Sequence, residues 1–96
     1  MSRHRYLVCY DISDDRRRTD VFRLLRDHGD HVQYSVFFCE LTAMELTGLK
    51  ASLADGLNHK TDQVIMLDLG EAVKPLDLSF ACLGKAYAPA NHVLVV

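Results

Sequence analysis

The chain has 96 residues, of which 49% are hydrophobic and 25% charged, so it has room for one domain and is too apolar to stay disordered. Its longest apolar stretch, residues 6–10, is far shorter than the roughly 20 residues of a membrane span. The net charge is −2, yet all seven arginines lie within residues 3–26, and guanidinium groups suit phosphate well. We therefore expect one cytoplasmic domain over residues 1–96, without membrane contact and with an arginine-rich first third.

The first strand and the first helix are predicted from alternation and from capping residues. Residues 5–12 alternate as a strand whose two faces are both apolar until Asp11. Such a strand is buried on both sides, which predicts helices on one face and another cover, such as a second subunit, on the other. A helix should follow from Asp15 to His28, capped by Ser13 or Asp14 and ended by Gly29.

The rest of the chain predicts strands around one further helix. Residues 31–41 read either as one bent strand or as a tight hairpin, because no glycine or proline marks a turn. Thr42 and Glu45 form a capping box for a helix that ends near Gly56. Strands are expected over residues 63–69, 80–83 and 92–96.

This order predicts an α+β protein, a ferredoxin-like βαββαβ sandwich with an additional C-terminal strand. That last strand, residues 92–96, lacks polar alternation and would be an exposed apolar edge unless it pairs with something. We therefore interpret residues 85–96 as a segment that pairs with a second copy or with a partner. A homodimer follows as an expectation.

Asp11 is the strongest candidate for chemistry. A carboxylate at the end of a strand buried on both faces loses hydration unless it binds a proton, an arginine or a metal, although it could simply cap the turn into the helix. Magnesium is usually held by one or two carboxylates with waters and phosphates. Two copies of Asp11 related by a dimer axis would therefore suffice for a Mg²⁺ site.

The arginine run is the candidate for contact with nucleic acid. Arg16, Arg17 and Arg18 lie at a helix start, where cations oppose the helix dipole, so they either contact phosphate or pair with nearby acids. The local pairings open to them are Arg16 with Asp20, Arg17 with Asp14 or Asp20, and Arg18 with Asp15. Helical spacing points Arg18 along the buried stripe toward the end of the first strand.

Two further pairs of residues have two interpretations each. Gln33 and Ser35 are polar on a strand face that continues as apolar, so they either face solvent or line a covered polar cleft. Tyr10 and Phe37 either stack on bases or fill the core.

Several of these residues lie in blocks that closely resemble the CRISPR-associated protein two family. The blocks are Tyr10-Asp11-Ile12-Ser13-Asp14-Asp15 with the arginine run, Gly29, Val32-Gln33-Tyr34-Ser35-Val36-Phe37, and Leu83-Gly84. Members partner the spacer integrase in CRISPR adaptation, an antiviral defence, and are often described as endoribonucleases.

The resemblance implies a ferredoxin-like homodimer whose two Asp11 carboxylates face each other across a cleft and hold magnesium. It also implies that Asp11 is catalytic, with Tyr10, Arg18 and Phe37 in the active region. Asp20 and His31 stand where some members have arginine, which predicts a weaker or differently arranged grip on substrate.

Three functions follow from this interpretation. The first is a magnesium-dependent endonuclease of CRISPR adaptation that acts on RNA or double-stranded DNA. The second is a non-catalytic dimeric scaffold that bridges the CRISPR integrase and DNA. The third, which we favour least, is a toxin-type ribonuclease of related fold.

Overall fold

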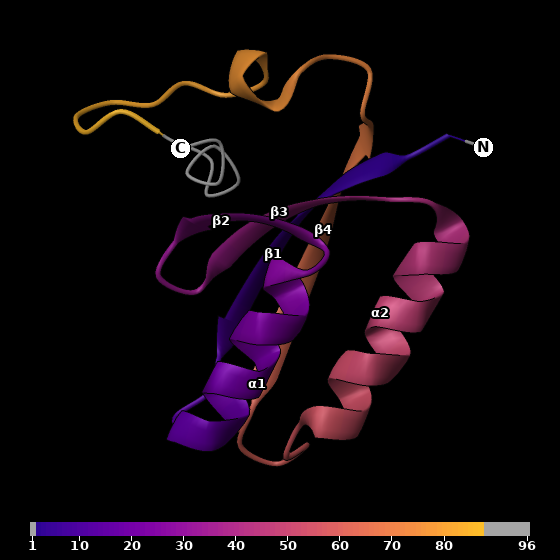
Figure 1. Cartoon of the computed structure of the whole chain (residues 1–96), viewed down its shortest axis with the longest axis vertical. Helices are drawn as coiled ribbons and strands as arrows, with labels where there is room; N and C mark the ends of the chain where they lie inside the picture. Colours follow the sequence, from indigo (N-terminus) through magenta and orange to yellow (C-terminus); the bar gives the residue numbers. More distant parts are fainter. Residues whose placement is uncertain (1, 88–96) are drawn as a thin grey trace.

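The chain folds into one four-stranded sheet with two helices, as a computed structural model that describes residues 2–87 shows. The elements in chain order are β1 (His4–Asp11), α1 (Asp15–Arg26), β2 (Gly29–Gln33), β3 (Val36–Leu41), α2 (Ala43–Gly56), β4 (Gln63–Glu71) and a short 3-10 helix, η1 (Leu76–Leu78). The strands are antiparallel in the order β2-β3-β1-β4, and both helices lie on one face of the sheet (Figure 1). The predicted ferredoxin-like α+β class is confirmed.

The alternation of β1 decides which side chains enter the core. Tyr6, Val8 and Tyr10 face the helices and are buried, whereas Leu7 and Cys9 face the other side of the sheet and are half-buried. The same core contains the most deeply buried side chains of the other elements, among them Leu25, Phe37 and Leu49. The predicted cover of one face by helices is therefore confirmed.

Residues 31–41 form a hairpin rather than one bent strand. β2 and β3 are joined at Tyr34 and Ser35, and Gln33 pairs with Val36. Ser35 thus lies in a turn and not within a strand.

Gly29 does not end the first helix, as the sequence pattern predicts, because α1 stops two residues earlier than expected, at Arg26. Gly29 opens β2 instead and is required by a close approach of β3: a Cβ atom at this position would lie 2.2 Å from the carbonyl oxygen of Phe38. The glycine therefore serves the packing of β2 on β3.

The predicted strand over residues 80–83 is wrong. No strand forms there, and the chain after β4 instead passes across the sheet face opposite the helices, where Phe80 stacks on Phe38 with a centroid distance of 5.6 Å. Phe80 is therefore held by packing against Phe38 and not by hydrogen bonds to a neighbouring strand. The strand predicted over residues 92–96, and most of the segment 85–96, lie outside the described residues.

Arg5 attaches this C-terminal segment to the sheet. Its side chain is 8% exposed and donates from Nη2 to Glu40 Oε2 (2.6 Å) and to the Lys74 carbonyl (2.7 Å), and from Nη1 to Ser79 Oγ (2.9 Å). A buried charge is tolerated only when its donors find acceptors. Arg5 therefore holds β3 and the segment after β4 together.

The second apolar face of the sheet is covered only in part. A groove of about 770 Å³ remains between the sheet and the C-terminal segment, with Leu7, Cys9, Gln33 and Phe38 among its lining residues. On β4, Ile65, Leu67 and Leu69 are each about half exposed, at 54%, 53% and 49%. Exposed apolar rows of this kind mark surfaces that contact another molecule.

The three thiols should differ in reactivity, because Cys39 is buried and Cys82 is exposed. Burial raises the pKa of Cys39 from 9.0 to about 11, so almost none of it is thiolate at neutral pH. We expect iodoacetamide to label Cys82 within minutes and Cys39 only after unfolding, as measured by mass spectrometry. Labelling of Cys39 at the same rate as Cys82 in the native protein would contradict this packing.

Candidate active site

Asp11 is the last residue of β1, at one end of the sheet. It pairs in register with Gln63 at the start of β4, and the neighbouring Tyr10 N–H donates to the Ser35 carbonyl at 3.1 Å. Asp11 is exposed, so the expectation that this carboxylate loses its hydration within one chain is wrong. The reason is its position: the alternation of β1 directs Asp11 to the face without helices, at the point where the strand ends.

Arg18 lies beside this strand end, as its helical spacing predicts. Its Nη1 donates to the carbonyls of Ile12 (3.1 Å) and Ser13 (3.2 Å), the two residues that follow Asp11. Arg18 also forms the predicted ion pair with Asp15, and this hydrogen bond raises the pKa of the Arg18 guanidinium. Arg18 thus holds the backbone next to Asp11.

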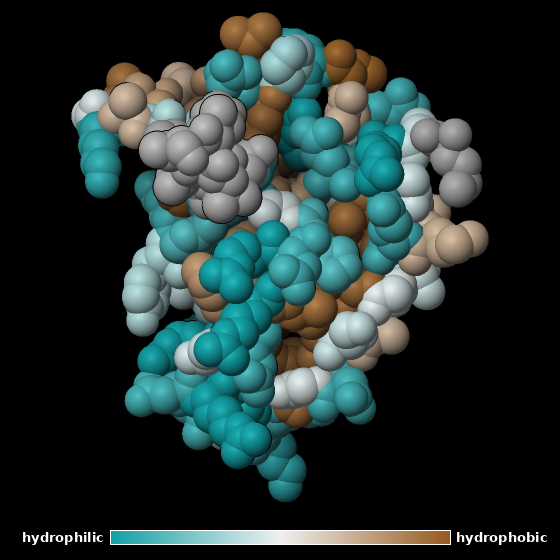
Figure 2. Space-filling model, viewed as in Figure 1, coloured by the Kyte–Doolittle hydropathy of each residue, from teal (hydrophilic) through white to brown (hydrophobic). Residues whose placement is uncertain are grey.

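Arg17 has a partner that the sequence pattern does not reveal. Its Nη1 lies 3.8 Å from Asp14 Oδ2, one of the predicted partners, but its Nε donates to Asp62 Oδ2 at 2.7 Å. Arg16 is exposed, and its predicted ion pair with Asp20 is not among those formed by residues 2–87. The outward surface of α1, which carries Arg16, is hydrophilic (Figure 2).

The Arg17–Asp62 pair should make stability depend on pH. Hydrogen bonds from Arg17 and from the Asn58 N–H lower the pKa of Asp62 from 3.8 to about 2. A carboxyl with a lowered folded pKa stabilises the fold above its unfolded pKa, and this contribution disappears as the pH falls through the folded value. We expect urea unfolding to show a loss of stability between about pH 4 and pH 2. Asp62→Asn should remove part of that loss, since Glu45 and Asp68 also have lowered pKa values; an unchanged pH dependence would contradict this.

Tyr10 and Phe37 belong to the core. Phe37 is fully buried, Tyr10 is 6% exposed, and their ring centroids lie 6.4 Å apart. Burial also raises the pKa of the Tyr10 hydroxyl, with Arg18 acting in the opposite direction. The placement of Phe37 as a residue that meets substrate is thus corrected for the single chain: it supports the strand end from inside.

The remaining predicted site residues are arranged around the same end of the sheet. Gln33 is exposed, as the solvent-facing interpretation expects, and it lines the groove on the open face, while Ser35 contributes its carbonyl to Tyr10. His31, one of the two departures from the family pattern, packs its ring against Phe37 with a centroid distance of 4.9 Å. Asp20, the other, is exposed on α1.

The described part of one chain does not contain a full set of metal ligands. Within residues 2–87 there is no group of three or more His, Cys, Asp or Glu side chains that could hold an ion. Asp11 nevertheless fits as part of a magnesium site, because it is an exposed carboxylate with no hydrogen bond or ion pair recorded to the described residues. Magnesium needs few protein carboxylates and keeps several waters.

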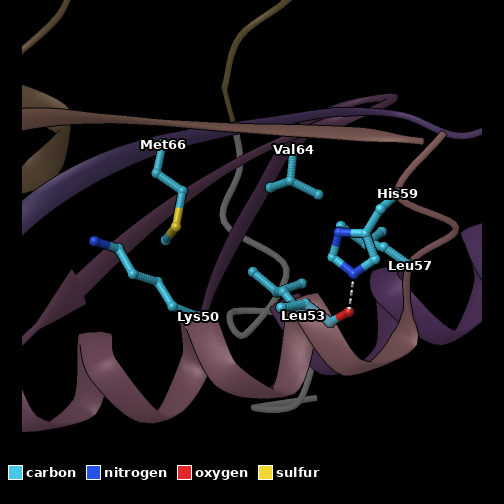
Figure 3. A pocket seen from close by; sticks show the side chains of 7 residues that line it. Lys50, Leu53, Leu57, His59, Val64 and Met66 are labelled. Carbon is cyan, nitrogen blue, oxygen red and sulfur yellow. Dashed lines mark hydrogen bonds between the residues drawn. The ribbon is translucent and has the colours of Figure 1, made fainter. Parts of the chain in front are cut away.

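A smaller hollow of about 320 Å³ lies between α2 and β4 (Figure 3). Leu53 of α2 and Leu57, the residue just after α2, lie opposite Val64 and Met66 of β4. The His59 ring closes one side, with its Nε2 2.8 Å from the Ala54 carbonyl oxygen. No carboxylate lines this hollow. It borders β4, whose outer edge is unpaired in residues 2–87.

The fold is that of a small ferredoxin-like α+β protein with one antiparallel sheet, and the Asp11 carboxylate lies at the end of its central strand β1. Residues 4–74 match the family described as CRISPR associated protein Cas2. The CRISPR-associated endoribonuclease Cas2 1 of Rhodospirillum rubrum is 40% identical over 88% of this chain and 81% of its own length. The CRISPR-associated endoribonuclease Cas2 of Geobacter sulfurreducens is 36% identical over 97% of both chains. The chain belongs to the Cas2 family.

Solved structures agree with this assignment. Streptococcus pyogenes Cas2 superposes with a TM-score of 0.71 at 32% identity, covering 83% of this chain and 99% of that one. A hypothetical protein from Thermus thermophilus also gives a TM-score of 0.71, at 30% identity over 90% of this chain and 99% of its own. Within residues 2–87, neither α1 nor α2 has the length and apolar character of a membrane-crossing helix.

Proposed function

We propose that this chain acts as a homodimeric, magnesium-dependent endonuclease of CRISPR adaptation that cleaves phosphodiester bonds in RNA or double-stranded DNA. The observation that carries the proposal is the exposed carboxylate of Asp11, at the end of a central strand whose following backbone is held by Arg18. Relatives named endoribonucleases at 36–40% identity support the reaction class. We also place this activity in the cytoplasm, where the three free cysteines would stay reduced.

A homodimer would supply the second carboxylate that residues 2–87 of one chain do not provide beside Asp11. Asp11 lies at the end of β1 on the same sheet face as the half-exposed Ile65 and Leu67. Packing two copies through this face would cover the apolar row and bring two Asp11 carboxylates to one axis, where they share an ion. The unpaired edge of β4 offers the surface on which segment 85–96 of a second copy would pair.

The residues of the site would have two roles, metal binding and contact with the nucleic acid. Bound magnesium would polarise the scissile phosphate and lower the pKa of a water nucleophile. The two Asp11 carboxylates would orient that ion between the copies. Arg16, exposed at the start of α1, and Arg18 would contact phosphates of the nucleic acid, with Gln33 and Ser35 at the rim of the site.

The proposal is tested by incubating the purified chain with single-stranded RNA and with duplex DNA of matched sequence. We expect cleavage of at least one substrate in MgCl₂ and none after addition of EDTA, with activity restored by excess Mg²⁺. Cleavage that persists in EDTA would contradict metal dependence. A protein that cleaves neither substrate would contradict the nuclease assignment.

A non-catalytic scaffold is the second candidate, and one observation favours it: a single chain contributes only Asp11 and no cluster of ligands within residues 2–87. In that case a dimer would bridge the CRISPR integrase and DNA through phosphate contacts. Asp11→Ala would leave spacer acquisition intact, whereas Arg16→Glu would weaken DNA binding and reduce its salt dependence. Loss of acquisition by an Asp11→Ala protein that still assembles would exclude the scaffold.

A further inference from the structure

Asp62 is a carboxylate whose hydrogen-bonding capacity is already used. It accepts from Arg17 Nε (2.7 Å) and Nη2 (3.3 Å), from the Asn58 N–H (2.9 Å) and from Thr61 Oγ1 (3.2 Å), and its side chain is closed off from solvent. A carboxylate with four donors has no lone pair left for a metal or a substrate. Its role must therefore be exerted through the segments that it joins.

Those segments flank Asp11. Arg17 is in the first turn of α1, where its own N–H donates to the capping Asp14 Oδ2 at 2.9 Å. Asp62 immediately precedes Gln63, the residue that pairs with Asp11 in the last position of the β1–β4 ladder. The Arg17–Asp62 pair thus lies directly beyond the end of the ladder that carries Asp11.

Arg18 acts on the same segment from the other side. It holds the carbonyls of Ile12 and Ser13, the two residues between Asp11 and the helix cap. The backbone after Asp11 is therefore fixed by Arg18, and the strand opposite Asp11 is fixed by Arg17 through Asp62. Without these contacts the last pair of a strand ladder opens easily, because terminal pairs have the lowest local stability.

We propose that Arg17 and Asp62 are positioning residues that keep Asp11 in place by holding the start of β4 against the end of β1. The inference rests on the proposed role of Asp11 as a magnesium ligand. A ligand shared between two copies must be held to within about 0.5 Å, so opening of its strand pair weakens metal binding before it unfolds the domain. It also changes the function expected of Arg17 from phosphate contact to positioning.

Two conservative variants test the pair. Asp62→Asn keeps the size of the side chain and removes its charge, and Arg17→Lys keeps the charge and removes the two-pronged contact. Asp55→Asn and Arg23→Lys are matched controls, because both residues are exposed on helices and form none of the ion pairs within residues 2–87.

The first measurement is amide hydrogen exchange of Asp11 and Gln63 by NMR. In Asp62→Asn and Arg17→Lys, the amides of Asp11 and Gln63 should exchange about tenfold faster than in the wild type. The amides of Val8 and Leu49 in the core should stay protected. Both control variants should exchange at the wild-type rate. Unchanged exchange at Asp11 and Gln63 would overturn the proposal. So would an equal acceleration at all amides, because that result describes general destabilisation.

The second measurement is the Mg²⁺ concentration that gives half-maximal cleavage. We expect it to rise by about tenfold in Asp62→Asn, with the rate at saturating Mg²⁺ nearly unchanged, as for residues that orient a metal ligand. A wild-type Mg²⁺ requirement would overturn the positioning role. If Asp11→Ala itself cleaves normally, the proposed function fails instead. Exchange at Asp11 and Gln63 then tests by itself whether Arg17 and Asp62 hold the end of the β1–β4 ladder.

Discussion

Replacing Asp11 by alanine is expected to reduce magnesium-dependent cleavage by about 100-fold or more while leaving the fold intact. The carboxylate is exposed and no hydrogen bond to it is recorded from the described residues, so its removal leaves no buried group without a partner. Initial cleavage rates with RNA and with duplex DNA, together with thermal unfolding, measure the two effects separately.

Asp55→Ala is the matched control for this variant. Asp55 is an exposed carboxylate in α2, and its removal changes the net charge equally without altering the end of β1. It should cleave at the wild-type rate. Equal rates for Asp11→Ala and the wild type would show that Asp11 is not catalytic, and equal losses in both variants would point to net charge instead.

Gly29→Ala should lower the free energy of unfolding by about 3 kcal/mol, because the added methyl group has no space. The new Cβ would lie 2.2 Å from the Phe38 carbonyl oxygen and 2.6 Å from Cys39 Sγ, so the backbone of β2 or β3 must shift. Urea unfolding monitored by circular dichroism measures the change.

Gly48→Ala should instead raise the free energy of unfolding. Gly48 lies inside α2 with nothing within 4 Å of the position of a Cβ atom, so alanine there should stabilise the fold by about 1 kcal/mol. A Gly29→Ala protein as stable as the wild type would contradict the packing of β2 on β3, and destabilisation by Gly48→Ala would contradict the open space beside α2.

Local patterns predicted most of the fold because the interactions behind them are local. The alternation of Tyr6, Val8 and Tyr10 and the capping box of Thr42 and Glu45 depend on neighbours within a few residues, and both are present. Local patterns wrongly predicted a strand over residues 80–83. Its apolar side chains are satisfied by the stack of Phe80 on Phe38, a contact between distant parts of the chain.

The candidate site shows the same division. Helical spacing predicted that Arg18 reaches the end of β1, and it does. The bonds of Arg5 to Glu40 and of Arg17 to Asp62 join residues that are far apart in the sequence, so no spacing rule indicates them. An arginine within an otherwise apolar strand was the one available sign for Arg5.

In the proposed dimer, each chain contributes one of the two Asp11 carboxylates that hold the metal ion. Titration of the wild-type protein with Mn²⁺, followed by electron paramagnetic resonance, counts the bound ions directly, and sedimentation in the same buffer gives the number of chains. We expect one tightly bound ion for every two chains, and none in Asp11→Ala at the same dimer content. An ion bound by each monomer, or binding that survives in Asp11→Ala, would contradict it.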